Sequence, residues 1–260
     1  MRIFVIGSGR MANALAPALL RAGHHITGIH SRNQKTGTSL SKYLRCAFFE
    51  SLQIPKETEL IIVAVNDDAT KTVASRIPKS KAIIVHTSGS VDMSALGRKK
   101  SAGVFYPLET MSGKRRVAFR KIPVCVEASD EKTLISLLSL AHSLSEHVYV
   151  LDSEKRKALH VAAIFTNNFT NHLLGLASEI SSQEGVPFRI LEQLALTTIK
   201  NAFQNHPRQV QTGPARRGDQ KTIDRHLAYL KKQPQARELY AMISKQIVAV
   251  HKKGKPQSGH

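Results

Sequence analysis

Residues 2–12 read Arg-Ile-Phe-Val-Ile-Gly-Ser-Gly-Arg-Met-Ala, an apolar run that leads directly into the pattern Gly7-x-Gly9-x-x-Ala12. In a strand–turn–helix unit, the first glycine allows a tight turn and the second lets the backbone approach a pyrophosphate. The small third residue lets the helix pack closely on the strand, with phosphate at the helix N-terminus. Apolar residues recur at helical spacing after Ala12, so this stretch predicts a dinucleotide-binding unit. Its predicted cofactor contacts are Gly7, Ser8, Gly9, Arg10, Met11 and Ala12.

The residues after the next predicted strand, 25–30, decide which dinucleotide fits. In such a fold, a residue about 20 positions beyond the glycines meets the adenosine ribose. The sequence there is Ser31-Arg32-Asn33, which has no carboxylate to accept a hydrogen bond from a free 2′-hydroxyl. Ser31 can donate a hydrogen bond and the Arg32 guanidinium can pair with a 2′-phosphate, so we expect NADP(H) as the cofactor. The alternative is that Arg32 is a solvated loop charge.

Apolar runs of strand length alternate with helical stretches as far as residue 151. This alternation predicts an α/β fold with a doubly wound, mostly parallel Rossmann sheet, whose ligand lies beyond the carboxyl ends of the strands. From Asp152 onward the pattern is helical only. We therefore expect an NADP-binding domain over residues 1–151 and an all-α domain for substrate binding over residues 152–260. The end of the chain, rich in Gly and Lys, is expected to be frayed.

Two loops that follow predicted strands are candidate cofactor contacts. Val65, Asn66 and Asp67 follow one strand, and Asp67 has the alternative role of capping the next helix. Ser88 and Gly89 follow another and are expected to pass near the nicotinamide.

Two more residues near the ends of strands are candidates for contacts with substrate. His86 precedes the Ser88 loop and is a candidate substrate-binding residue, with a structural role as the alternative. Tyr106 follows a further strand and offers a catalytic hydroxyl, although a buried structural tyrosine explains the pattern equally well.

Residues 158–178 contain no Lys, Arg, Asp or Glu, a length that could span a bilayer. His160, Asn167 and Asn171 fall inside this stretch, and such polar groups are costly in hydrocarbon, so we expect a buried helix of a soluble protein instead. The three residues recur at i, i+7 and i+11, which is one helical face. They are expected to line a cleft between the domains, with His160 as general acid, Asn167 as a second catalytic residue and Asn171 as a substrate contact.

The formal net charge is +19, with 38 basic and 19 acidic residues. Such a field favours anionic ligands, which include NADP, anionic metabolites and nucleic acid. Aromatic residues do not alternate with the charges and Trp is absent, so nucleic acid is not favoured and a generic basic surface is the simpler interpretation. Cys46 and Cys125 lack the spacing of metal ligands, and a metal-free protein of the reducing cytoplasm is expected.

The chain resembles bacterial Rossmann-like oxidoreductases of the coenzyme F420-dependent NADP oxidoreductase type that carry a helical C-terminal domain of unknown function. More broadly, it resembles the superfamily of 6-phosphogluconate dehydrogenase and pyrroline-5-carboxylate reductase. The resemblance rests on motifs spread over nearly the whole chain: Val65-Asn-Asp-Asp68, His86-Thr-Ser-Gly89, Tyr106-Pro-Leu108, His160-Val-Ala-Ala-Ile-Phe-Thr-Asn167-Asn168 and Thr212-Gly-Pro-Ala-Arg-Arg-Gly-Asp219.

The resemblance implies a homodimer and a substrate-carboxylate loop at residues 212–219, where Arg216 or Arg217 would bind an acid. The alternative role for this loop is a surface cap. Hydroxyacid dehydrogenases of the superfamily have a catalytic Lys four residues before an Asn. Aligning that Asn with Asn167 places Ala163 at the Lys position, so oxidation through that Lys is not expected.

Two functions remain open at this point. The first is an NADP(H)-dependent oxidoreductase acting on a small, anionic substrate. The second is an NADP-binding sensor or scaffold without turnover, in contact with nucleic acid through its basic surface.

Overall fold

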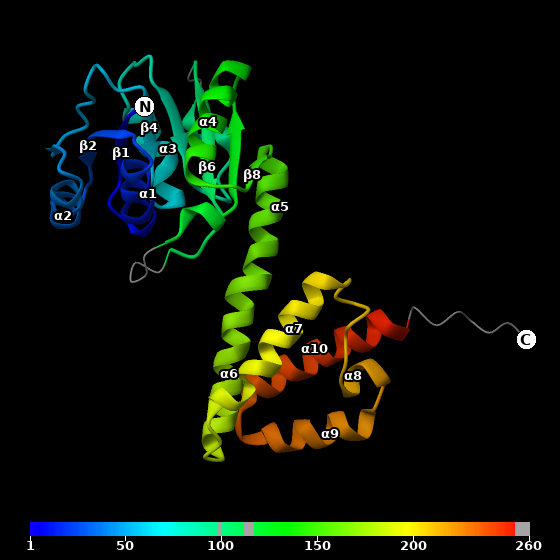
Figure 1. Ribbon diagram of the computed structural model, residues 1–260. Coiled ribbons are helices and arrows are strands. Elements are labelled where there is room, and N and C mark those ends of the chain that lie inside the picture. The colour runs from blue at the N-terminus through cyan, green and yellow to red at the C-terminus, as the bar shows by residue number, and fades with distance from the viewer. Residues whose placement is uncertain (98–99, 112–116, 253–260) are drawn as a thin grey trace, which may run out of the picture. The chain divides into compact units, whose positions relative to one another are not determined.

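The computed structural model describes residues 1–97, 100–111 and 117–252. The end of the chain that we expected to be frayed lies largely outside these ranges. The chain forms two compact units, Met1–Thr166 and Asn167–His260. Figure 1 colours the first unit from blue to green and the second from yellow-green to red.

The first unit is built on one eight-stranded sheet in the order β3-β2-β1-β4-β5-β6-β7-β8. Neighbouring strands are parallel except for β6 and β7, which pair antiparallel. This confirms the predicted doubly wound, mostly parallel sheet. The strands are β1 Arg2–Ile6, β2 His25–His30, β3 Phe48–Phe49, β4 Leu60–Val63, β5 Ile83–His86, β6 Ala102–Pro107, β7 Val124–Ala128 and β8 Val148–Val150.

Helices cover the sheet on both faces, which is why its central strands are apolar without interruption. Side chains of a strand alternate between the faces. Ile3 and Val5 pack in one hydrophobic core with residues of α1, α2 and α4, whereas Phe4 and Ile6 pack in a second core with α3. The helical elements of this layer are α1 Arg10–Arg21, α2 Gln34–Leu44, α3 Asp67–Arg76, η1 Met93–Leu96, η2 Phe119–Lys121 and α4 Glu131–Leu144.

The chain changes direction across the sheet between β1 and β4. It leaves β1 toward β2 and β3 on one side and returns to β4 on the other, which makes this edge the topological switch point where such folds bind ligands. Gly7 follows β1 there, and its N–H donates to the carbonyl of His30 at 2.8 Å. Its φ is +120°, and a Cβ atom at this position would lie 2.1 Å from the carbonyl oxygen of Ala64. Only glycine fits this bend.

Helix α5, Ser153–Ala163, belongs to the first unit, so the boundary lies beyond the expected position at residue 151. The reason is packing: Arg156 is completely buried, and Leu159 packs against the small apolar cluster around Tyr106. A π-helical segment, Ile164–Phe169, follows directly, and the unit boundary falls inside it.

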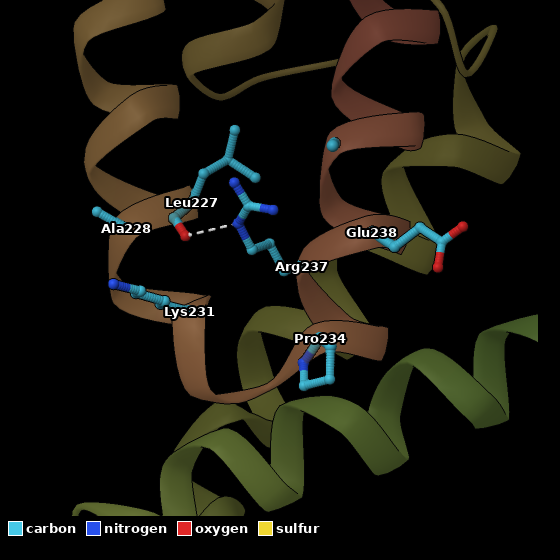
Figure 2. Close-up of a pocket in the computed structure, with 7 residues that line it drawn as sticks. Leu227, Ala228, Lys231, Pro234, Arg237 and Glu238 are labelled. Carbon is cyan, nitrogen blue, oxygen red and sulfur yellow. Dashed lines mark hydrogen bonds between the residues drawn. The ribbon is translucent and has the colours of Figure 1, made fainter.

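The second unit is helical in every described element. These elements are α6 Thr170–Gln183, η4 Phe188–Leu191, α7 Glu192–Gln204, α8 Pro214–Arg217, α9 Gln220–Tyr229, η5 Leu230–Lys232 and α10 Pro234–Lys252. Helix α8, which lies within the stretch 212–219 that was expected to be a loop, packs against α10. Figure 2 shows the hollow between α9 and α10, about 720 Å³ in volume, where Arg237 Nε donates to the carbonyl of Leu227 at 3.2 Å.

The stretch 158–178 is not a buried helix in the single chain, contrary to expectation. Arg156 is the only buried residue of α5, and α6 has none. Phe165 is 63% exposed and Phe169 48%. None of the described helices is both long and apolar enough to cross a bilayer.

Candidate cofactor and catalytic site

The start of α1 offers unpaired backbone donors to an anion. Gly9 is the N-cap residue with no side-chain cap, and the first turn of α1 contains no acidic residue. Asn13 Nδ2 donates to the carbonyls of Ser8 at 2.7 Å and Gly9 at 3.0 Å, which fixes the loop. A Cβ atom at Gly9 would meet nothing within 4 Å, so the space over this loop is open. An open cradle at a helix N-terminus fits a pyrophosphate.

Three hydroxyl groups join the glycine loop to the end of β2. Ser8 Oγ lies 2.6 Å from Ser31 Oγ and 2.6 Å from Thr36 Oγ1. Ser31 is 8% exposed and also accepts the Asn33 N–H. Its hydroxyl is therefore used within the protein, which favours a supporting role over the direct 2′-phosphate contact that the sequence predicted. Arg32 is exposed beside this group, as a contact with a phosphate requires.

The three residues after β4 that were predicted to contact the cofactor differ in burial: Val65 is half-buried, whereas Asn66 and Asp67 are exposed. Val65 is half-buried, and one of its methyl groups lies 3.5 Å from the Cβ position of Gly7. Asn66 is exposed and is the N-cap residue of α3, although its side chain makes no capping hydrogen bond. Asp67 begins α3 and accepts a hydrogen bond from Ser90 Oγ, which ties this helix to the loop after β5.

The three predicted contacts at the start of α1 also differ in burial. Arg10 is exposed, Met11 is half-buried and Ala12 is buried under the glycine loop.

His86 is completely buried at the end of β5. Its Nδ1 accepts the Ser88 N–H at 3.2 Å, so the neutral ring carries its proton on Nε2, which has no hydrogen-bond partner among the described residues. Burial, followed by the charge of Arg156, lowers the pKa of His86 to about 4, and a backbone contact with Asp92 opposes this shift without cancelling it. A fully buried ring does not fit the predicted direct contact with substrate. His86 instead orders the Ser88 backbone.

Tyr106 and His160 form a polar pair over the loop after β5. The Tyr106 hydroxyl lies 3.1 Å from His160 Nδ1, and the rings meet edge to face. A Cβ atom at Gly89 would lie 2.6 Å from His160 Nδ1 and 2.8 Å from the Tyr106 oxygen, so the pair rests directly on Gly89. Burial first, and then the neighbouring Cys125 thiol, raise the pKa of Tyr106 to about 12. The phenol therefore keeps its proton at neutral pH.

Arg156, Glu127 and Ser153 form a buried polar cluster beside this pair that sequence reasoning missed. Arg156 Nη2 lies 3.1 Å from Glu127 Oε2, and these side chains are 1% and 13% exposed. No pattern in the sequence separates Arg156 from the exposed charges around it. A basic residue four positions before His160 is the only signal.

The remaining candidates lie in the second unit. Asn167 falls in the π-helical segment and Asn171 in α6, and both are exposed. Because a π-helix has more residues per turn than an α-helix, the spacing that placed His160, Asn167 and Asn171 on one face does not hold through this segment.

Arg217 ends the short helix α8. Gly213 and Pro214 begin this helix, Gly218 ends it with a φ of +73°, and the Asp219 carboxylate accepts the Thr222 N–H at 3.1 Å as the cap of α9. Local capping thus accounts for much of the 212–219 motif, while Arg217 itself is exposed.

Of the predicted site residues, the structure brings together His160, Tyr106, Gly89 and Ser88 in the first unit. Among the described residues, no group of three His, Cys, Asp or Glu could hold a metal ion.

Two family models match the sequence. The one described as NADP oxidoreductase coenzyme F420-dependent matches residues 2–89, and a domain of unknown function, DUF2520, matches residues 122–247. A comparison with curated proteins found no match.

Solved structures match over nearly the full chain. A Bacteroides fragilis protein crystallised as a candidate NADP oxidoreductase is 35% identical, with a TM-score of 0.86 over 95% of this chain and 98% of that one. A reductive aminase from Aspergillus terreus in complex with NADPH and ethyl levulinate is 16% identical, with a TM-score of 0.73 over 97% and 94%. An imine reductase from Myxococcus stipitatus in complex with NADP+ is also 16% identical, with a TM-score of 0.68 over 97% and 93%. The latter two show the fold alone.

This chain belongs to the family of NADP oxidoreductases that join a Rossmann domain of the coenzyme F420-dependent type to the helical DUF2520 domain. Its cofactor is NADP(H). The open helix N-terminus at Gly9 and the exposed guanidinium after β2 are the features of this chain that fit that cofactor.

Replacing Gly9 with Ala is expected to separate cofactor binding from folding. The new methyl group meets no protein atom within 4 Å, so the free energy of unfolding falls by less than about 1 kcal/mol. The methyl group occupies the space that the pyrophosphate needs, so NADPH binding weakens by at least about tenfold in calorimetry. Gly7→Ala is the matched comparison, and because of its positive φ and the Ala64 carbonyl it lowers the free energy of unfolding by about 1–3 kcal/mol. Unchanged NADPH affinity in Gly9→Ala would contradict this placement of the pyrophosphate.

The buried His86 is expected to make the free energy of unfolding depend on pH in the acidic range. Its pKa is lowered from 6.5 to about 4 in the folded protein, so between these values the unfolded chain binds a proton that the folded chain does not. The free energy of unfolding therefore falls by roughly 3 kcal/mol as the pH drops through this window. His86→Asn, which keeps an acceptor for the Ser88 N–H but does not titrate, flattens this slope in urea titrations followed by circular dichroism. The exposed His142→Gln serves as control, and equal slopes in the two variants would show that His86 is not the cause.

Proposed function

We propose that this chain uses NADPH to reduce a C=N or C=O group in a small, anionic substrate. The observation that carries the proposal is the Tyr106–His160 pair, held on Gly89. Strands β1, β4, β5 and β6 are parallel neighbours, so the glycine loop, the Asn66 loop, the Ser88 loop and Tyr106 lie along one edge of the sheet. A proton donor and a cofactor cradle at one edge are what a reductase needs.

The cofactor, when bound, supplies the hydride that adds to the substrate carbon. The chain supplies the proton: the Tyr106 hydroxyl gives its hydrogen to the substrate nitrogen or oxygen, where negative charge develops. The raised pKa of Tyr106 keeps this hydrogen in place until it is needed. His160 Nδ1 lies 3.1 Å from the Tyr106 oxygen, so the imidazolium form of this ring can return a proton to the phenolate and become the neutral imidazole. This pair replaces the superfamily Lys, whose aligned position is Ala163.

The helical unit supplies the remaining substrate contacts in this proposal. Asn167 takes part in catalysis, Asn171 and Arg217 bind the substrate, and the substrate lies between the units as the sequence predicted. Arg217 and the net charge of +19 support an anionic substrate.

We also propose that the protein acts as a homodimer through the helical unit. Several large apolar side chains of its helices are exposed in the single chain, and exposed apolar faces of this extent mark association sites. They include Leu173 on α6, Ile190 on η4, and Leu194, Leu196, Ile199 and Phe203 on α7, the last being 82% exposed. In the proposed homodimer, the same face of a second chain buries these apolar side chains.

Replacing Arg32 with Glu tests the contact with the 2′-phosphate. The change reverses the charge beside the phosphate, so NADPH binding weakens by more than about 1.4 kcal/mol, or tenfold, while NADH binding changes little. Arg21→Glu, at the far end of α1, is the control and leaves both affinities unchanged. Equal losses of NADPH and NADH binding in Arg32→Glu would remove this basis for cofactor choice.

Turnover is tested by NADPH oxidation against a panel of cyclic and acyclic imines, keto acids and a deazaflavin. Tyr106→Phe removes the proton donor and keeps the ring, so kcat falls by about 10²–10⁴-fold with unchanged NADPH affinity. Tyr149→Phe, which alters an exposed tyrosine, leaves kcat unchanged. Tight NADPH binding with no oxidation of any substrate by the unmodified protein would instead favour the sensor or scaffold. Full activity in Tyr106→Phe would exclude this proton donor.

A further inference from the structure

Arg156 is the largest of the fully buried side chains among the described residues, and its guanidinium joins the loop after β5 to Glu127 and Ser153. Nη1 donates to the carbonyl oxygens of Ser88 and Gly89, each at 3.0 Å. Nη2 donates to Glu127 Oε2 at 3.1 Å and to Ser153 Oγ at 3.0 Å, and Ser153 Oγ in turn donates to the Glu127 carboxylate. A buried guanidinium is costly unless it is paired, and this one is neutralised by Glu127.

These bonds determine where the backbone N–H of Gly89 points. The structure has no cis peptide bond among its described residues, and in a planar trans peptide the N–H lies opposite the carbonyl. Because the Ser88 carbonyl faces the guanidinium, the Gly89 N–H faces away from it. Gly89 is a buried residue, and no acceptor within the described chain pairs with its N–H. A backbone donor in such a place normally has a partner. The nearby positive charge also polarises the peptide and strengthens the donor.

The same loop supports the proton donor. Gly89 lies directly under Tyr106 and His160, so a shift of the Gly89 backbone displaces both side chains. Through its hydrogen bonds to the Ser88 and Gly89 carbonyls, Arg156 therefore fixes the unpaired Gly89 N–H. The same bonds fix the backbone on which Tyr106 and His160 pack.

We propose that Arg156 is a positioning residue for the hydride-transfer site, and that it holds the Gly89 N–H as a donor to the carboxamide oxygen of the nicotinamide ring. The inference rests on the proposed function, because it needs an NADP(H) molecule whose nicotinamide reaches the Ser88 loop. Glu127 and Ser153 act with Arg156 by fixing its guanidinium plane.

The test compares two ligands that share the adenosine end but differ at the other. NADP+ carries the nicotinamide, whereas adenosine 2′,5′-bisphosphate lacks it. In Arg156→Lys, one ammonium cannot reach the four acceptors that the guanidinium joins, so NADP+ binding measured by calorimetry weakens about tenfold. Binding of adenosine 2′,5′-bisphosphate is unchanged. Lys155→Met, an exposed neighbour on α5, alters neither affinity.

Ser153→Ala is a milder variant that keeps the test valid if Arg156→Lys does not fold. It removes one acceptor of Nη2 and is expected to weaken NADP+ binding selectively, by a smaller factor. Equal weakening of both ligands, or no change in either, would overturn the inference while leaving the proposed function intact. Failure of the unmodified protein to bind NADP+ at all would overturn both.

Discussion

The close approach of Gly7 to the carbonyl of Ala64 is the constraint on which the cofactor site depends. It joins the end of β1 to the end of β4 at the point where the chain changes direction across the sheet. Because no side chain fits there, the backbone turns at once into α1 and presents the N-terminus of that helix to the open edge. Asn13 and the hydroxyls of Ser8 and Ser31 then fix this loop against its surroundings.

The architecture of the first unit was predictable from the sequence because its strands are buried on both faces. Such strands appear as unbroken apolar runs, and their order along the chain, with helices between, allows few sheet topologies. The glycine pattern located the switch point, and the absence of a carboxylate after β2 pointed to NADP, the cofactor of the family. The position of the boundary was not predictable in this way. The charged first turn of α5 resembles a solvated helix start, and only the fold shows that Arg156 is buried there.

The candidate site was predictable as a set of loops but not as a set of contacts. Tyr106 and His160 were both expected at the substrate site, but nothing in the sequence predicted that their side chains would contact each other. Ser88 and Arg156 are 68 positions apart, so their hydrogen bond has no local signature. The burial of His86 and the internal pairing of Ser31 were missed because strand-end position alone cannot separate residues that face a ligand from residues that support the loop. The π-helical segment was missed because its composition fits an α-helix.

Arg156 and His160 lie one turn apart on α5, and one holds the Ser88 loop while the other holds the phenol. A helix moves as a rigid rod over so short a length. In the proposed function, any tilt or slide of α5 therefore moves the Ser88 loop and the Tyr106–His160 contact together. One short helix thereby couples the placement of the cofactor to the delivery of the proton.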